Sequence, residues 1–242
     1  MTPINGGWTI IDAEAGVWMR EYSFDGRSTA NCLVARMADD NLLVISPACN
    51  MTDAAFETLQ RLGHVGAIVA NNGLHHLGLA EWTARFPHAS VHAPGAAMVR
   101  LRDRSPTLGA ILPFERLNGR LRGRIHLIEA PFTRCGESVA IIRIRRGWAW
   151  FVSDLLVNME RIKAPLPIRL LFRLTRSGPG YRIFNLAMRQ TVKDRVAVLS
   201  WLSGELTQRP PVIIVPSHGK FLDHPGLYRQ TQDMVSEALR PR

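Results

Sequence analysis

The stretch Ile68-Val69-Ala70-Asn71-Asn72-Gly73-Leu74-His75-His76-Leu77-Gly78-Leu79 decides how we interpret this chain. An apolar run ends at Ala70, a polar turn follows, and two adjacent histidines stand at the predicted first turn of a helix ending near Phe86. Side chains at a strand's carboxyl end face a shared crevice, and imidazoles are common metal ligands. Two ordinary surface histidines on a loop would show the same sequence pattern. The choice between a metal site and a plain loop therefore depends on the rest of the chain.

Composition favours a folded protein of the reducing cytoplasm. Hydrophobic residues make up 46% of the 242 residues, which is enough for a core, so we expect one domain spanning 1–242. The three cysteines are odd in number and widely spaced, which fits neither a disulfide framework nor a zinc ribbon. The sequence has no long apolar run and no basic region followed by an apolar stretch at its start, so we predict a cytoplasmic location.

The net charge of +10 favours anionic partners. We expect a small, anionic substrate and do not expect nucleic acid as the main partner. Contact with a membrane surface is compatible with the charge, and both a monomer and a homodimer remain open.

Strands and helices alternate in an order typical of layered folds. Residues 8–11, 17–20, 31–36, 42–46, 66–70, 89–93, 125–128, 139–144, 148–152 and 211–215 are predicted strands, with a hairpin through Asp39-Asp40-Asn41. Helical spacing and caps predict helices at 52–63, around 184–202 and around 230–239. Residues 100–124 are polar and basic, so we expect a surface excursion. The order predicts an α+β fold, an αββα sandwich of two mixed sheets packed face to face with helices on the outer faces.

A short basic amphipathic segment lies between residues 160 and 180. Arg169, Arg173 and Arg176 follow at i, i+4 and i+7, and Ile168, Leu171, Phe172 and Leu174 lie beside or between them. A helix packed on the domain with a solvated arginine face explains this pattern. A lid over the substrate and a contact with a membrane surface are the alternatives.

Three predicted strands end in residues that ligate metals. His75 and His76 follow Ala70, Asp154 follows Val152, and His218 follows Val215. Imidazoles and a carboxylate suit a borderline ion such as Zn²⁺ or Fe²⁺. The joint placement of these residues predicts one metal centre, while each of them alone would not.

Motifs at these strand ends resemble those of the metallo-β-lactamase superfamily. They are Ser153-Asp154, Pro216-Ser217-His218-Gly219 and His76-Leu77-Gly78, and the resemblance spans roughly residues 15–220. It is strongest to a bacterial branch whose members show an Asn/His-His turn, a Ser/Thr-Asp-Leu-Leu strand end and a final Ser-His-Gly. The resemblance implies an αββα sandwich with its site at the shared edge of the two sheets.

The chain departs from the family pattern in its metal-binding turn. The family's His-x-His-x-Asp-His aligns with Asn71, Gly73, His75 and His76, and the third histidine position falls near Thr133. The resemblance therefore implies that the first metal site is lost. It implies that the second remains, with His75 in place of the usual Asp, His76 and His218 as its histidines, and Asp154 as the bridging carboxylate.

The leading hypothesis is a metal-dependent hydrolase with one ion of Zn²⁺, or of Fe²⁺ or Mn²⁺, held by His75, His76, Asp154 and His218. Asp154 would ligate the ion or orient a water, and Asn71 or Asn72 would donate to a developing oxyanion. Four protein ligands can close a tetrahedral site, whereas catalysis needs an open position. The alternative is a non-catalytic member of the fold that binds an anionic ligand, a membrane surface or a partner protein through a decayed site.

Overall fold

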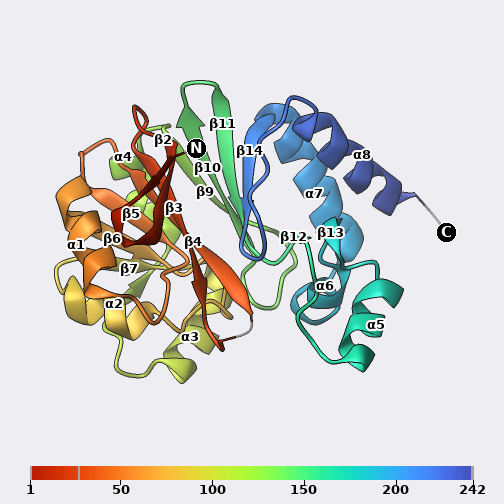
Figure 1. Ribbon diagram of the computed structural model, residues 1–242, viewed down its shortest axis with the longest axis horizontal. Coiled ribbons are helices and arrows are strands. Elements are labelled where there is room, and N and C mark those ends of the chain that lie inside the picture. Colours follow the sequence, from red (N-terminus) through yellow and green to blue (C-terminus); the bar gives the residue numbers. More distant parts are fainter. Residues whose placement is uncertain (1, 27, 241–242) are drawn as a thin grey trace.

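Two β-sheets face each other in the computed structural model, which describes residues 2–26 and 28–240 (Figure 1). The first sheet has eight strands in sequence order: β1 (Thr2–Ile4), β2 (Trp8–Asp12), β3 (Val17–Ser23), β4 (Thr29–Arg36), β5 (Leu42–Ile45), β6 (Val65–Val69), β7 (Ser90–His92) and β8 (Ile111–Leu112). The second has four strands in the order β14 (Pro211–Pro216), β11 (Gly147–Val152), β10 (Ser138–Ile144) and β9 (Ile125–Glu129). A separate pair joins β12 (Leu156–Met159) to β13 (Gly180–Ile183).

Each main sheet mixes antiparallel and parallel pairing, as predicted. In the first sheet, β1 to β5 pair antiparallel and β5 to β8 pair parallel, and the predicted hairpin joins β4 to β5. In the second sheet, β9, β10 and β11 are antiparallel, whereas β14 runs parallel to β11. The carboxyl ends of β11 and β14 therefore lie side by side, with Val152 opposite Pro216.

Helices cover the outer faces of both sheets, so the predicted αββα sandwich is confirmed (Figure 1). The helices are α1 (Asp53–Leu62), α2 (Leu79–Arg85), α3 (Met98–Arg104), α4 (Asn118–Leu121), α5 (Leu166–Leu174), α6 (Asn185–Thr191), α7 (Arg195–Gln208) and α8 (Leu227–Leu239). Among the described residues, none of them is long and apolar enough to cross a bilayer.

Three apolar layers result from this stacking. Leu33 and Ile45 of the first sheet meet Phe151 and Val215 of the second in the central layer. A second layer lies between the first sheet and α1 to α3, and a third lies between the second sheet and α6 to α8. Strands buried on both faces explain why β5 and β6 are continuous apolar runs without alternation.

The prediction of a surface excursion over residues 100–124 was wrong. This segment contains most of α3, and all of β8 and α4, and it buries Phe114, Leu117 and Leu121 in the central layer. These three residues fall at i, i+3 and i+7, which is a helical period, but the two helical turns that carry them, Phe114–Leu117 and Asn118–Leu121, are each only four residues long.

Two helix predictions also need correction. The helix predicted over 184–202 is two helices, because the backbone at Val192 is extended and Asp194 caps α7 by accepting a hydrogen bond from the Ala197 N–H. Helix α2 begins at Leu79, so His75 and His76 precede it and do not form its first turn. The reason is local, since Asn72 Oδ1 accepts from the N–H groups of both Leu74 and His75 and holds the turn in a non-helical form.

Candidate metal centre

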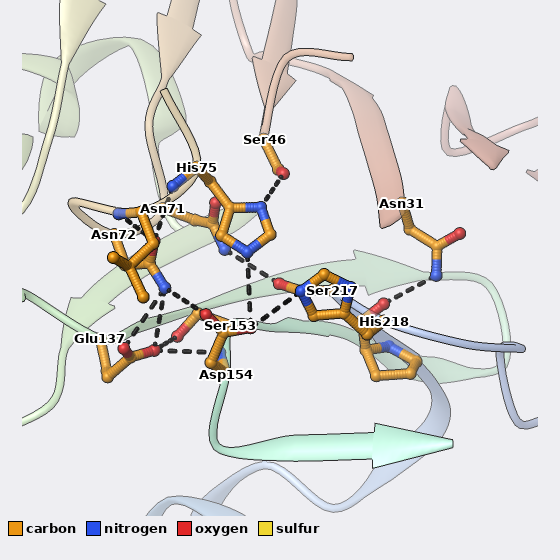
Figure 2. A network of polar contacts seen from close by, with 12 residues as sticks. Asn31, Ser46, Asn71, Asn72, His75, Glu137, Ser153, Asp154, Ser217 and His218 are labelled. Atoms are coloured by element: carbon orange, nitrogen blue, oxygen red, sulfur yellow. Dashed lines mark hydrogen bonds and ion pairs between the residues drawn. The ribbon is translucent and has the colours of Figure 1, made fainter. Parts of the chain in front are cut away.

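Three strand ends from both sheets meet at one crevice (Figure 2). His75 follows β6 of the first sheet, while Asp154 and His218 follow the neighbouring strands β11 and β14 of the second. The rings of His75 and His218 lie 5.3 Å apart between centroids. The sandwich therefore brings these three residues together, as the sequence predicted.

The turn that carries His218 is fixed by both neighbouring layers. The buried side chain of Asn31 in β4 donates from Nδ2 to the carbonyl groups of Pro216 and Gly219, at 2.8 and 2.7 Å. Gly219 has a φ of 92°, and a Cβ there would lie 2.0 Å from the Asn158 carbonyl oxygen. Only glycine fits this close contact, which explains the Ser-His-Gly order of the motif.

Asp154 lies between the two imidazoles. Its Oδ1 atom is 3.4 Å from His75 Nε2 and 3.4 Å from His218 Nε2, and the three ligand atoms all lie within 4.8 Å of one another. Asp154 and His75 are buried, and His218 is partly exposed to the pocket beside them. Two nitrogens and one carboxylate oxygen at this spacing are a suitable donor set for Zn²⁺ or Fe²⁺.

Each imidazole is oriented from behind through its Nδ1 atom. His218 Nδ1 is 2.9 Å from the Thr29 carbonyl oxygen, and His75 Nδ1 is 3.0 Å from Ser46 Oγ. A carbonyl can only accept, so His218 Nδ1 donates and the lone pair of the neutral ring is on Nε2, which faces Asp154. Metal-binding histidines are held in this way. The residues present therefore fit a metal ion.

Without an ion, the three side chains stabilise one another by charge. Burial by itself would raise the pKa of Asp154, but the adjacent His75 and His218 hold it well below the usual range. Burial opposes a charged His218, yet its bond to Asp154 raises the pKa of the ring. A cation between these residues would replace this attraction with stronger bonds to the same atoms.

Glu137, which the sequence analysis missed, forms the floor of the crevice. Its fully buried carboxylate accepts from Asn72 Nδ2 at 3.2 Å, from Ser153 Oγ at 2.5 Å and from the Asp154 N–H at 3.0 Å. Burial and the nearby charge of Asp154 raise its pKa. A single glutamate before a strand has no local signal of such a role, and only the pairing of β10 with β11 places it there.

The oxyanion role predicted for Asn71 and Asn72 does not fit this geometry. Asn72 Nδ2 donates to Glu137 and, at 3.0 Å, to Asp154 Oδ2, while Asn71 Nδ2 donates to Ser217 Oγ at 3.1 Å. Both side chains are buried, and neither lines the pocket beside the histidines. Asn72 positions the turn and Asp154, and Asn71 is bonded to Ser217, so both amides point into the protein and away from the pocket.

His76 is not in the His75, Asp154 and His218 group, which is the candidate set of ligands found among the described residues. Its ring is half-buried, and burial lowers its pKa, as do the charges of Arg100 and Arg104. The structure thus brings together three of the four predicted ligands. Thr133, at the aligned third-histidine position, is buried and bonds to the Ala130 carbonyl.

A largely apolar pocket of about 370 Å³ opens directly on the three ligands. Tyr22, Phe24, Leu74, Leu77 and Phe184 form much of its wall. His75, Asp154 and His218 provide its polar end. A small molecule with an apolar part and one reactive polar group would match this lining.

Fold and site together define a protein of the metallo-β-lactamase fold, and similar solved structures support this. The metallo-β-lactamase FIM-1 from Pseudomonas aeruginosa in its mono-zinc form aligns with a TM-score of 0.58 and 14% identity, over 99% of this chain and 98% of its own. A metallo-β-lactamase from Erythrobacter litoralis, with β-mercaptoethanol in its active site, aligns with a TM-score of 0.59 and 14% identity, over 95% and 96%. The flavodiiron core of Flv1 from Synechocystis sp. PCC6803 aligns at 0.58 and 16%, over 98% of this chain and 60% of that one.

No family model and no curated protein matches the sequence. At these identities the structural likeness establishes the fold, and the chemistry must be argued from the residues of this chain.

Proposed function

We propose that the protein is a metal-dependent hydrolase with one ion held by His75, Asp154 and His218. The observation that carries the proposal is the convergence of two Nε2 atoms on Asp154 Oδ1, with both Nδ1 atoms bonded behind. Three protein ligands leave a fourth position for water or substrate, as catalytic zinc sites do. A set of three protein ligands would avoid the closed site that four would form.

When bound, Zn²⁺, Fe²⁺ or Mn²⁺ would act as a Lewis acid and lower the pKa of water toward about 7. The chain's own residues supply the rest. His75 and His218 hold neutral nitrogen donors in place, and Asp154 supplies negative charge from a position fixed by the Asn72 amide. The apolar walls exclude water around the reacting group and receive the apolar part of the substrate.

We infer that the substrate is a small ester, lactone or phosphoester. A hydrolysable polar group must reach the polar end of the pocket, while its apolar part contacts Phe24, Leu74 and Phe184. The net charge of +10 favours an anionic molecule. The alternative is a module that binds such a molecule without turnover.

Metal analysis tests the proposal most directly. Purified wild-type protein loaded with Zn²⁺, Fe²⁺ or Mn²⁺ should retain about one ion per chain after desalting. His218→Ala should retain little, whereas His88→Ala, a substitution of an exposed histidine on the surface, should retain as much as the wild type. Equal metal content in all three proteins would refute the metal centre.

A panel of esters, lactones and phosphodiesters then separates the hydrolase from the binding module. Metal-dependent turnover that is lost in Asp154→Ala supports the hydrolase. Retained metal with no turnover of any substrate, combined with saturable binding of the same compounds, would support the binding module instead.

A further inference from the structure

Helix α5 presents an apolar stripe to solvent. Leu166, Leu170 and Leu174 are spaced at i, i+4 and i+8, and 74%, 55% and 73% of their respective surfaces are exposed. None of the nine residues of α5 is buried. Figure 1 shows α5 at the lower right margin of the molecule, outside the helices that cover the second sheet. Exposed leucines in one stripe are typical of a contact surface.

A stripe of arginines runs beside the leucines. Arg169 and Arg173 are one turn apart on α5, and Arg176 follows just after the helix ends. All three are exposed. An apolar stripe flanked by arginines is the pattern of a helix that lies in the plane of a membrane interface.

The inner side of α5 is fixed, so the outward face does not result from a loose helix. Thr175 at its end is buried and bonds through Oγ1 to the Leu171 carbonyl and to Ser177 Oγ, at 2.8 and 2.9 Å. The ring of Phe172 packs on that of Phe184, with centroids 5.8 Å apart. The leucine stripe is therefore held in an orientation that points away from the protein.

The charge around α5 has one sign over a long stretch. Residues 161–193 contain eight basic residues and no acidic residue. Several of them, including Arg173, Arg176, Arg182 and Arg189, line a groove of about 1330 Å³ between α5, α6 and α8. Such a surface attracts an extended anionic partner.

We propose that α5 docks this protein on the surface of a lipid bilayer that contains anionic lipids. The leucines would enter the interface between headgroups and acyl chains, and the arginines would bind headgroup phosphates. Nucleic acid would use the arginines but leave the leucine stripe in water. A second copy of the chain would bring two basic surfaces together, and Glu237 is the one acidic residue among those that line the groove to offset their repulsion.

The docking surface lies beside the mouth of the site pocket. Phe184, which packs on Phe172 of α5, lines that pocket, and its ring centroid is 6.4 Å from that of His218. Residues 163–165, just before α5, line a hollow together with Gly26 in the loop after β3. A bilayer in contact with α5 would thus lie next to the opening through which a substrate enters.

Sedimentation of the full chain with vesicles tests the proposal. We compare vesicles of phosphatidylcholine alone with vesicles of phosphatidylcholine and phosphatidylglycerol. The wild type should bind the anionic vesicles at least about tenfold more tightly, and added salt should weaken this binding. The variants Leu170→Ser/Leu174→Ser and Arg169→Glu/Arg173→Glu should each lose at least about tenfold in affinity.

Matched controls use similarly exposed residues on other helices. Val99→Ser/Val196→Ser removes exposed apolar side chains, and Arg102→Glu/Arg116→Glu reverses two exposed charges. Both controls should bind anionic vesicles within about twofold of the wild type, since their positions lie outside residues 161–193. His218→Ala should also bind like the wild type, so a failure of the metal centre and a failure of the docking surface are distinguishable.

Three results would overturn the proposal. One is wild-type binding by Leu170→Ser/Leu174→Ser, whose substituted positions are exposed and whose folding is checked by circular dichroism. Another is a wild type that binds a short DNA duplex but does not bind vesicles, together with a leucine variant that binds the duplex equally well. The third is a wild-type dimer in analytical ultracentrifugation that the leucine variant converts to monomer, which would assign the face to a second copy of the chain.

Discussion

The crevice has two parts whose polar groups are used differently. In the floor, formed by Asn71, Asn72, Glu137, Ser153 and Ser217, nearly every described donor and acceptor has a partner within the protein, and Asn71 Oδ1 is without one. In the ligand part, formed by His75, Asp154 and His218, two imidazoles bring Nε2 atoms to one carboxylate oxygen. Both parts are polar and largely buried. Burial and polarity therefore do not mark a reactive site, whereas donor atoms that converge beside an open pocket do.

The largest effect should come from Asp154, the residue of the ligand part that is hydrogen-bonded to the floor. Asp154→Ala removes one of three donor atoms and the negative charge between the imidazoles, and it also leaves Asn72 Nδ2 without one acceptor. Metal affinity should fall by more than about 100-fold, because about 100-fold is already the largest loss expected when a residue that only orients a ligand is removed. Isothermal titration calorimetry with Zn²⁺ measures this. Affinity within tenfold of the wild type would mean that Asp154 belongs to the floor alone.

Glu137 tests whether the floor is structural. Glu137→Ala leaves three buried donors, from Asn72, Ser153 and Asp154, without their acceptor. The free energy of unfolding should fall by about 3 kcal/mol. Urea unfolding measures the loss, and Glu137→Gln, which keeps one acceptor oxygen, should cost less. Equal stability of the alanine variant and the wild type would contradict the division of the crevice into two parts.

The two parts also differ in how well the sequence predicts them. His75, Asp154 and His218 each end an apolar run, so the end of a strand and a ligand type coincide and predict the site. Glu137 immediately precedes β10, and Ser46 immediately follows β5. Their roles depend on which strands pair and which loops meet, and one chain's periodicity does not determine these.

The fold shows the same limit. Long apolar runs and caps predicted β4 to β6, α1 and the αββα layering, because strong local signals agree there with the tertiary structure. The short strands β12 and β13 were missed, and Phe114, Leu117 and Leu121 were not assigned to the core. In both cases the contacts formed are long-range, and the elements, four residues each, are too short for their spacing to predict them.

Ser46 tests the support of the ligand part from behind. Ser46→Ala removes the hydrogen bond to His75 Nδ1 and frees the ring to rotate. Metal affinity should fall about tenfold, with little change in the free energy of unfolding. Ser90→Ala is a matched control, since Ser90 Oγ bonds to His92 Nε2 outside the crevice. Equal effects of the two substitutions on metal affinity would remove Ser46 from the site.

His76 decides between three protein ligands and four. His76 is absent from the ligand group, so His76→Ala should have little effect on metal affinity. The loss should be smaller than the roughly tenfold loss expected when a residue that only orients a ligand is removed. Calorimetry under the conditions used for Asp154→Ala measures the difference. A loss as large as that of Asp154→Ala would restore His76 to the ligand set and close the position that the proposed hydrolase needs open.

The smallest effect concerns a carboxylate at the opposite end of β11, beyond both parts of the crevice. Asp12 accepts hydrogen bonds from the N–H groups of Ala15 and Arg145, each at 3.0 Å, and so links β2 to the β10–β11 turn. Burial by itself would raise the pKa of Asp12, but these N–H groups hold it below the ordinary value of 3.8. A lowered folded pKa stabilises the protein above the unfolded pKa of about 3.9, and this stabilisation is lost as pH falls through the folded value.

Urea unfolding between about pH 6 and about pH 3 should therefore show less loss of stability for Asp12→Asn than for the wild type. The difference should be small, because Asp12 is largely solvated and solvent screens its interactions. Asp103→Asn, an exposed substitution on α3, is the control and should follow the wild type. Identical acid limbs for Asp12→Asn and the wild type would mean that the two N–H groups do not lower the pKa of Asp12 in the folded protein. The acid sensitivity of the protein would then come from other carboxylates whose pKa the fold lowers, such as Asp39 and Asp154.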